Sequence, residues 1–327
     1  MTGRGLVNGV GRAVCLGMSV CVAVLTAAPA MCATYVVQPD GLGDYATIQD
    51  AVLNATDGDT IELTDGVFTG DGNRDIQVPS RPITIRSQSY DYMSCIVDCG
   101  GSARDAHRGF WFTSDVGTGD PTLQGIGIKN GYVYDGGAGI FVEGASPTIM
   151  SCAVAFCTVD NDNGKGGGLR VNQGGSPQVE NCVFSENSAG YGGGVAVDGA
   201  SGGYPFNDIV DNTATNAGGG VYIEADDLTV FSYCDISSNE APQAGGARVN
   251  GEYVYLQFDN ICRNEATSLW GGGVLLLDGL VKQCTLVENS SATGGGGIHS
   301  HAGFGTIDKC LVAFTESGYG IGATDGY

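Results

Sequence analysis

The chain has 327 residues, and its 36 acidic residues outnumber its 14 Lys and Arg, which gives a formal net charge of −22 at neutral pH. Such an acidic surface opposes binding to nucleic acid and to anionic membranes. It also disfavours direct binding of polygalacturonate, unless cations bridge the two anions.

The first 30 residues have the pattern of a cleaved secretory signal peptide. Arg4 and Arg12 precede the apolar run AVCLGMSVCVAVLTAA, and APA stands before Met31. Loss of this segment removes two Arg and no acid, which leaves 12 basic and 36 acidic residues and a net charge of −24. We therefore expect an exported protein, extracellular, periplasmic or at the cell surface. No later stretch is long enough for a transmembrane helix.

Residues 31–105 are predicted to form an N-terminal cap and the first coils of a repeat structure. The stretch TIQDAVLNA places Ile48, Ala51, Val52 and Ala55 on one helical face, so a short amphipathic helix is expected there. A helix at this point would cover the strand edges of an open first coil. The string GDYATIQDAV, followed by GDTIEL, resembles the opening segment of pectinesterase-like and other β-helix proteins.

A calcium-loop hypothesis arises at DGNRD. Asp71, Asn73 and Asp75 supply alternating oxygen donors, although Ile76 stands where such a loop wants glycine. The same residue types are common in ordinary turns, which is the alternative. Weak Ca²⁺ binding is the only cofactor expected.

From residue 106 to 327 the chain repeats a glycine cluster followed by an aliphatic residue. These aliphatic positions recur 24 to 29 residues apart and are Ile140, Leu169, Val195, Val221, Ala247, Val274 and Ile298. A unit this short cannot enclose its own core, so stacked units must share one. GYGIGATDGY starts another such strand and then stops, so we expect either a truncated chain or a last coil that pairs with another molecule.

Each unit contains three short segments with strand character. In the strand after the glycine cluster, Val195 and Val197 alternate with Ala196 and Asp198, which is a period of two. The glycine clusters argue against a solenoid of α-helices, because glycine destabilises a helix interior. The sequence therefore predicts an all-β fold, a right-handed single-stranded parallel β-helix with three strands per coil.

Two columns of side chains are predicted to stack from coil to coil. Asn tolerates a left-handed backbone and can bond its own turn, so one corner should carry a ladder of satisfied amides, at Asn187, Asn212, Asn239, Asn264 and Asn289. A second register should hold small buried thiols, with Asn207 and Asp259 replacing them in two coils: Cys152, Cys182, Cys234, Cys284 and Cys310.

Near the start of the chain, Cys95 and Cys99 flank IVD. A disulfide between them is one hypothesis, because an exported protein meets oxidising conditions. The cysteines of the stacked column are expected to be free.

The recurring FxxN-like and GGA-like strings resemble polymorphic outer-membrane protein repeats and, more broadly, the pectin-lyase-like β-helix superfamily. Ile, Val or Leu often replaces the Phe, and GGG usually replaces GGA. The resemblance spans roughly Leu123 to Tyr327 and implies the fold. It also implies that polysaccharide ligands lie along an outward strand face, but no dense Asp cluster or catalytic motif of a known lyase, hydrolase or esterase is present.

The outward face of the glycine-cluster strand is the predicted ligand surface. Its chemically active positions, expected to be solvent-exposed, are Arg170, Asp198, Tyr222, Glu224 and Arg248. Asp198 and Glu224 should lie on adjacent coils about 5 Å apart, which would suit a catalytic carboxylate pair with Arg248 nearby. Plain solvation is the alternative, since any outward column of a solenoid must be polar. Exposed substitutions such as Tyr222→Ala are expected to leave stability within about 0.5 kcal/mol.

Two aromatic residues and two histidines complete the candidates. Tyr191 and Trp270 each stand just before a glycine cluster, where a ring either stacks on a sugar or shields the turn. His299 and His301 project to one side of a strand as a metal pair would, but the preceding coil offers no third ligand.

Two functions remain open from sequence. The first is an adhesin-like or carbohydrate-recognising scaffold whose partner is a polysaccharide or a surface protein. The second is a polysaccharide lyase or glycoside hydrolase acting along the glycine-cluster strand.

Overall fold

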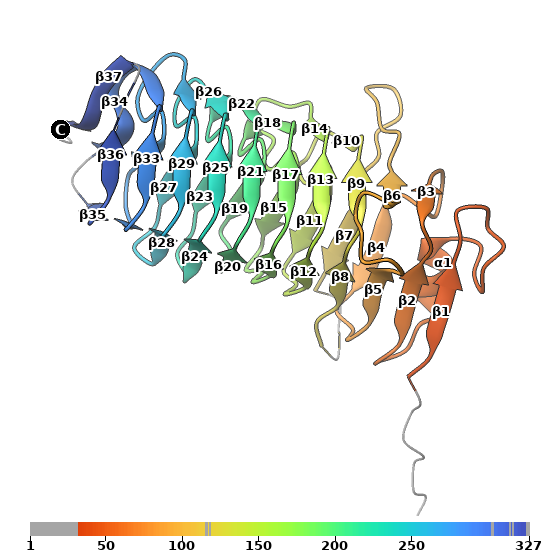
Figure 1. The fold of residues 1–327 in the computed structure, drawn as a ribbon. Helices are drawn as coiled ribbons and strands as arrows, with labels where there is room; N and C mark the ends of the chain where they lie inside the picture. Colours follow the sequence, from red (N-terminus) through yellow and green to blue (C-terminus); the bar gives the residue numbers. More distant parts are fainter. Residues whose placement is uncertain are drawn as a thin grey trace, which may run out of the picture. The chain divides into compact units, whose positions relative to one another are not determined.

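The computed structural model describes residues 32–114, 117, 119–301, 304–313, 315 and 317–324. The leader expected at residues 1–30 lies outside them. Cys32–Tyr327 forms one compact unit, in which three short strands recur in each coil of a parallel β-helix (Figure 1). Neighbouring coils pair in parallel and in register. The predicted three-stranded coil is therefore confirmed. No helix among the described residues is long and apolar enough to cross a membrane.

The coil strands form three sheets, which we call A, B and C. Sheet A contains β1 (Thr34–Val37), β2 (Thr60–Leu63), β5 (Thr84–Ser87), β8 (Thr122–Gln124), β12 (Thr148–Met150), β16 (Gln178–Glu180), β20 (Gly202–Pro205), β24 (Thr229–Ser232), β28 (Val254–Gln257), β32 (Leu280–Lys282) and β35 (Thr306–Asp308). Sheet B contains β3 (Gly66–Phe68), β6 (Cys95–Asp98), β9 (Gly127–Lys129), β13 (Ala153–Ala155), β17 (Val183–Ser185), β21 (Asp208–Val210), β25 (Asp235–Ser237), β29 (Asn260–Cys262), β33 (Thr285–Val287) and β36 (Leu311–Ala313).

Sheet C holds two rows of strands, one before and one after the glycine clusters. The first row is β10 (Tyr132–Val133), β14 (Thr158–Val159), β18 (Ser188–Tyr191), β22 (Thr213–Ala217), β26 (Glu240–Ala241) and β30 (Glu265–Ala266). The second row is β4 (Ile76–Pro79), β7 (Phe110–Thr113), β11 (Ile140–Glu143), β15 (Leu169–Asn172), β19 (Val195–Asp198), β23 (Val221–Glu224), β27 (Ala247–Asn250) and β31 (Val274–Leu276). The long strand β34 (Ser290–His301) joins the rows and pairs with β37 (Ser317–Thr324).

A single short helix, α1 (Ile48–Asn54), packs at the N-terminal end of the described coils against β1, β2 and β4. Thr47 caps it by accepting the backbone N–H of Asp50 on its side chain. The predicted apolar face is buried, with Ile48, Ala51 and Val52 fully inaccessible. The capping helix is therefore confirmed.

The clusters consist of glycine because the backbones of neighbouring coils approach too closely there to leave room for a side chain. A Cβ at Gly193 would lie 2.4 Å from the carbonyl oxygen of Thr213 and 2.6 Å from that of Gly219, both on the next coil. Gly218, with φ of +66°, needs the left-handed region as well. These positions turn the chain from the first row of sheet C into the second.

The turn from sheet B to sheet C carries the predicted asparagine ladder, which is confirmed. A residue with positive φ, such as Ser238 at 56°, precedes each ladder position. The Oδ1 of Asn239 accepts the backbone N–H and the side-chain amide of Asn212, at 2.9 and 3.0 Å. Its own amide donates to the carbonyl of Ile209, at 2.8 Å, and to Asn264 on the next coil, at 3.0 Å. The amide groups are thus satisfied while fully buried.

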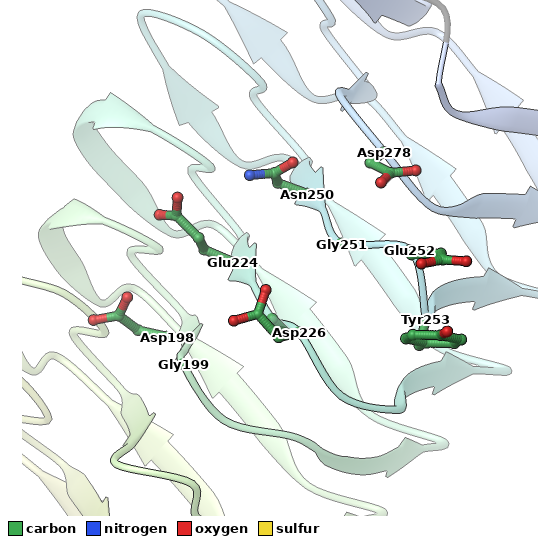
Figure 2. Close-up of a pocket in the computed structure, with 10 residues that line it drawn as sticks. Asp198, Gly199, Glu224, Asp226, Asn250, Gly251, Glu252, Tyr253 and Asp278 are labelled. Carbon is green, nitrogen blue, oxygen red and sulfur yellow. The ribbon is translucent and has the colours of Figure 1, made fainter.

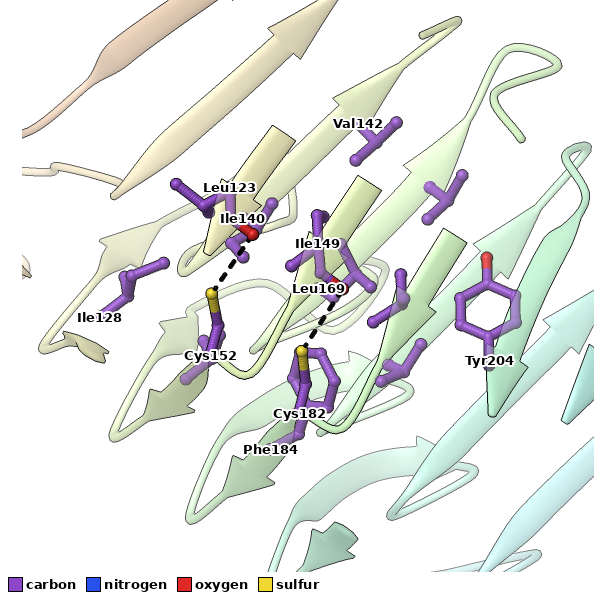
Figure 3. Packing of buried hydrophobic residues seen from close by; sticks show 14 of the residues in the cluster. Leu123, Ile128, Ile140, Val142, Ile149, Cys152, Leu169, Cys182, Phe184 and Tyr204 are labelled. Carbon is purple, nitrogen blue, oxygen red and sulfur yellow. Dashed lines mark hydrogen bonds between the residues drawn. The ribbon is translucent and has the colours of Figure 1, made fainter. Parts of the chain in front are cut away.

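The turn from sheet A to sheet B carries the column of thiols. Cys152 and Cys182 stack on consecutive coils, and their thiols donate to the carbonyl oxygens of Leu123 and Ile149, at 3.8 and 3.7 Å (Figure 3). Both are buried, as are Asn207 and Asp259 where they replace cysteine. The prediction of a buried column with free thiols holds, except that Cys310 at its end is half-buried.

The disulfide hypothesis for Cys95 and Cys99 is wrong, because both are free and buried. Cys95 begins the extended strand β6 and Cys99 follows its last residue. Four residues of extended chain separate Cα atoms by about 13 Å, which is beyond the reach of a disulfide.

Candidate functional site

The first outward position of the glycine-cluster strand is covered wherever it holds an apolar or aromatic residue, contrary to the sequence-based expectation. Ala196, Tyr222 and Leu275 at this position are 0, 5 and 3% exposed. Where an aromatic residue stands before a glycine cluster, it packs over the following coil. The ring of Tyr191, for example, meets that of Tyr222 edge-on, with centroids 5.1 Å apart. Arg170 and Arg248 at the first outward position are partly exposed, and so is the second outward position, which includes Asp198 and Glu224.

Tyr222 is the centre of the predicted site. The guanidinium of Arg248 lies 4.8 Å from its ring centroid, and the ammonium of Lys165 lies 5.1 Å from it. The Tyr222 hydroxyl donates to Oε2 of Glu224. Burial, followed by this bond to a carboxylate, raises the pKa of Tyr222 above its ordinary value. The phenol therefore stays protonated and serves as a donor.

Asp198 and Glu224 face each other in register across β19 and β23, as predicted. Their side chains are nevertheless engaged separately. Asp198 lies 2.7 Å from the ammonium of Lys165 and 3.5 Å from the guanidinium of Arg170, whereas Glu224 is bonded to Tyr222. Arg248 forms no ion pair with either carboxylate. The residues come together, but as a network of contacts rather than as a free carboxylate pair.

A cleft of about 550 Å³ opens beside this network, where sheet C turns into sheet A. We call it the acidic cleft. Figure 2 shows Asp198, Glu224 and Asn250 at the ends of successive strands, with the other side chains on the turns beyond them. The chain positions that line it are Asp198, Gly199, Glu224, Ala225, Asp226, Asn250, Gly251, Glu252, Tyr253 and Asp278. Five carboxylates and one phenol ring, 48% exposed at Tyr253, therefore line the acidic cleft.

A second cleft, of about 390 Å³, adjoins the first and shares Glu224 with it. We call it the Arg248 cleft. Its lining is Tyr191, Asn216, Ala217, Tyr222, Glu224, Pro242, Gln243 and Arg248. It thus offers one cation, one carboxylate, two amides and two phenol rings within a small volume.

Sequence reasoning missed half of the acidic cleft. Asp226, Glu252, Tyr253 and Asp278 come directly after the outward strand, in the turn that leads to sheet A. The strings IEADD, NGEY and LLLD repeat an acid at or just beyond the strand end, and this repetition is the signal that would have pointed to them.

The ring of Trp270 packs against two histidines. Its ring stacks on His299 at 5.0 Å and on His301 at 5.5 Å, with interplanar angles of 10° and 19°. Trp270 and Tyr191 therefore both cover neighbouring side chains, and stacking of either ring on a sugar stays a prediction. Burial, followed by the charge of His301, lowers the pKa of His299, whose Nδ1 accepts the N–H of Gly295 at 3.3 Å. No cluster of three His, Cys, Asp or Glu side chains suited to a metal occurs among the described residues.

The calcium-loop candidates are directed to different partners. Asp71 bonds Arg74 at 2.9 Å, and Asp75 bonds His107 at 2.5 Å. Asn73 is buried, and its Oδ1 accepts the N–H of Ile48 at the start of α1. Each of the three side chains thus has a protein partner of its own, and calcium binding at DGNRD stays an untested prediction.

Removal of the Tyr222 ring is expected to destabilise the protein by about 3 kcal/mol, because a buried ring and two cation contacts are lost. This replaces the earlier expectation of a neutral substitution. Tyr222→Phe keeps the ring and should cost less than about 1.5 kcal/mol. Urea denaturation of Tyr222→Ala, Tyr222→Phe and the parent protein tests this, and equal midpoints for all three would contradict it.

Comparison with known proteins agrees with this architecture. A family model described as the right handed beta helix region matches residues 51–228 and 124–327. The crystal structure of pectate lyase Pel9A is similar at 14% identity and a TM-score of 0.50, over 87% of this chain and 78% of that chain.

Weaker similarity extends to two further structures. The Yersinia enterocolitica family 28 exopolygalacturonase has 10% identity and a TM-score of 0.34, over 89% of this chain and 78% of that one. The A-module of the Azotobacter vinelandii mannuronan C-5 epimerase AlgE6 has 11% identity and a TM-score of 0.32, over 85% and 94%. No curated protein matches the chain. These similarities concern the fold alone.

Proposed function

Because the chain belongs to the right-handed β-helix family, we propose that it is an exported, adhesin-like scaffold that binds carbohydrate along the acidic cleft and the Arg248 cleft. The leader pattern at residues 1–30 supports export. The observation that carries the proposal is the pair of adjoining clefts, which share Glu224 and run across successive coils. Pectate lyase Pel9A shares the fold, which makes a polysaccharide the first class of ligand to test.

The lining of the acidic cleft suits a polyhydroxylated chain. Carboxylates at Asp226, Glu252 and Asp278 accept hydrogen bonds from hydroxyl groups. Tyr253 offers an exposed ring with a polar tip, the kind of side chain that serves at interfaces. A volume of about 550 Å³ lies within the usual range for ligand sites.

The charge of the cleft selects among polysaccharides. Carboxylates gathered in one cleft repel an anionic polymer, and the net charge of −22 adds to that repulsion at longer range. Neutral glycans do not face this penalty. We therefore propose a neutral polysaccharide as the ligand.

Cleavage by Asp198, Glu224 and Arg248 is the alternative, as a lyase or glycoside hydrolase. Paired-carboxylate hydrolysis needs one carboxyl group as an acid and a second as nucleophile or base. Asp198 is neutralised by two cations and Glu224 holds the Tyr222 hydroxyl, so binding has the better support. Release of reducing ends or of unsaturated sugars by the full chain would instead favour cleavage.

Tyr253→Ala should weaken binding to a neutral polysaccharide about tenfold, because it removes the exposed ring from the acidic cleft. The matched control is Tyr233→Ala. Tyr233 is similarly exposed, at 53%, but its two faces are stacked on Phe206 and Phe258, at 5.2 and 4.9 Å. The control should bind normally.

Affinity gel electrophoresis of both variants, with neutral, anionic and cationic polysaccharides in the gel, gives the comparison. Loss of retardation in Tyr253→Ala alone supports the proposal. Retardation by none of the polysaccharides, or equal retardation of the parent and Tyr253→Ala, overturns it.

A further inference from the structure

Arg248 differs from the other arginines of the network in having no polar partner. Within the described part of the chain its guanidinium makes neither an ion pair nor a hydrogen bond, and its Nη1 is buried without an acceptor. Its one recorded contact is the ring of Tyr222 at 4.8 Å. Arg170, one of its neighbours in the network, bonds Asp198 and the carbonyl of Asp135. A guanidinium stays charged at any physiological pH and carries five N–H donors, so Arg248 lines its cleft as an unused donor.

Glu224 provides an acceptor on the same cleft. Its Oε2 takes the Tyr222 hydroxyl, which leaves Oε1 for a donor from outside the protein. The bond to Tyr222 also holds the carboxylate in one orientation. The Arg248 cleft therefore presents a charged donor, Arg248, and a charged acceptor, Glu224. Tyr222 positions both, because its ring contacts Arg248 and its hydroxyl bonds Glu224.

The rest of the lining is small and partly apolar. Ala217 and Pro242 contribute aliphatic surface, and Tyr191 adds a ring that is fixed against Tyr222. Asn216 and Gln243 contribute amide groups. A ligand group here needs an acceptor, a donor and a small apolar part.

The charges of Arg248 and Glu224 further limit which ligand groups the cleft can bind. A carboxylated or sulfated sugar would satisfy Arg248 but would lie against Glu224 and the adjoining acidic cleft. An ammonium group would satisfy Glu224 but would meet the guanidinium. A neutral group that carries both a carbonyl and an N–H avoids both penalties, and an acetamido group has these two atoms and a methyl group.

We infer that the Arg248 cleft recognises the acetamido group of an N-acetylhexosamine unit within the glycan that the acidic cleft binds, an inference that rests on the proposed function. The acetamido carbonyl accepts from Arg248, its N–H donates to Oε1 of Glu224, and its methyl packs against Pro242 and Tyr191. The neighbouring sugar units continue into the acidic cleft across Glu224.

The test uses three trisaccharides that differ only in the group at C2 of each glucose-type unit. They are tri-N-acetylchitotriose, chitotriose with free amines, and cellotriose with hydroxyls. Isothermal titration of the full chain should give an affinity at least about tenfold higher for the N-acetylated trimer than for cellotriose, the other uncharged trimer, which corresponds to about 1.4 kcal/mol. Arg248→Gln should reduce this preference to less than about twofold, because a neutral amide donor is weaker than a charged one.

Two controls separate the possible failures. Glu252→Gln, in the acidic cleft, should weaken binding of the N-acetylated trimer and of cellotriose alike and leave the preference unchanged. Arg248→Lys keeps a cation near Tyr222 without the planar fork, so it also reports on the preference if Arg248→Gln fails to fold, as judged by near-ultraviolet circular dichroism.

Equal affinity for cellotriose and the N-acetylated trimer would overturn the inference while leaving the proposed function in place. A preference that survives in both Arg248 variants would overturn it as well. Absence of binding to these trimers and to every polysaccharide in the gel assay would overturn the proposed function itself.

Discussion

Asp259→Asn is expected to raise the free energy of unfolding by about 3 to 4 kcal/mol at about pH 8. Asp259 is buried in the thiol column, and burial raises the pKa of its carboxyl to about 7. The unfolded chain has an ordinary aspartate pKa near 3.9. The folded state thus holds the proton more tightly, and its stability falls as pH rises from about 4 through about 7. Asn removes this titration.

The column itself contains the matched control. Asn207 occupies the same register, where its Oδ1 accepts the N–H of Cys182 and its amide donates to the carbonyl of Val179, both at 2.9 Å. Asp259 likewise accepts the N–H of Cys234, at 2.8 Å. Asn207→Asp should therefore destabilise the protein by a similar amount at about pH 8, through the same desolvation of a buried carboxylate.

Urea denaturation of both variants at about pH 4 and pH 8 measures these effects. The stability gained in Asp259→Asn should fall to below about 1 kcal/mol at the lower pH, because the wild-type carboxyl is then protonated in the folded state and about half protonated in the unfolded chain. A gain that is independent of pH would show that the carboxyl does not titrate as described.

Asn239→Ala is expected to cost about 3 to 5 kcal/mol, because several buried groups lose their partners at once. The backbone N–H and side-chain amide of Asn212 lose their acceptor, and the carbonyl of Ile209 loses its donor. The ladder is also broken towards Asn264. Thermal and urea unfolding of the variant give the change in stability.

The control is Asn181→Ala, at an exposed asparagine in the turn from sheet A to sheet B, whose own φ is 52°. It makes no side-chain hydrogen bond in the described part of the chain, so its replacement tests the left-handed backbone alone and should cost about 1 kcal/mol. Equal destabilisation by the two substitutions would mean that the buried amide bonds of the ladder stabilise the protein no more than an exposed turn residue does.

The fold could be predicted because each unit repeats its constraints. A period of 24 to 29 residues, the alternation in strands such as Val195–Asp198 and the recurring Asn before each turn all require stacked coils. The capping helix was predictable for the same kind of reason, since Ile48, Ala51 and Val52 mark a single apolar face. The period of the apolar residues indicates both the backbone conformation and which side chains are buried. Both can be inferred from the residues of a single repeat.

The site was predicted less well, because its geometry depends on contacts between coils. Alternation along β23 indicates that Tyr222 points outward, but it does not indicate that Tyr191 and Lys165, from the two preceding coils, cover it. In the same way, the pairing of Asp198 with Lys165 joins neighbouring coils through side chains whose lengths and rotamers no repeat pattern specifies. The repeated acids of the turns were overlooked because they lie beyond the strand ends, outside the alternation from which the outward face was predicted.

Hydrogen exchange of the full chain, with and without saturating amounts of the best-binding polysaccharide, is the most direct test of carbohydrate recognition at the two clefts. We expect slowed exchange at amides of residues 198–200, 224–228 and 250–254, which border the acidic cleft. Unchanged exchange in these segments, or protection confined to the outer face of sheet B or to the exposed stack around Tyr233, would contradict the proposed function.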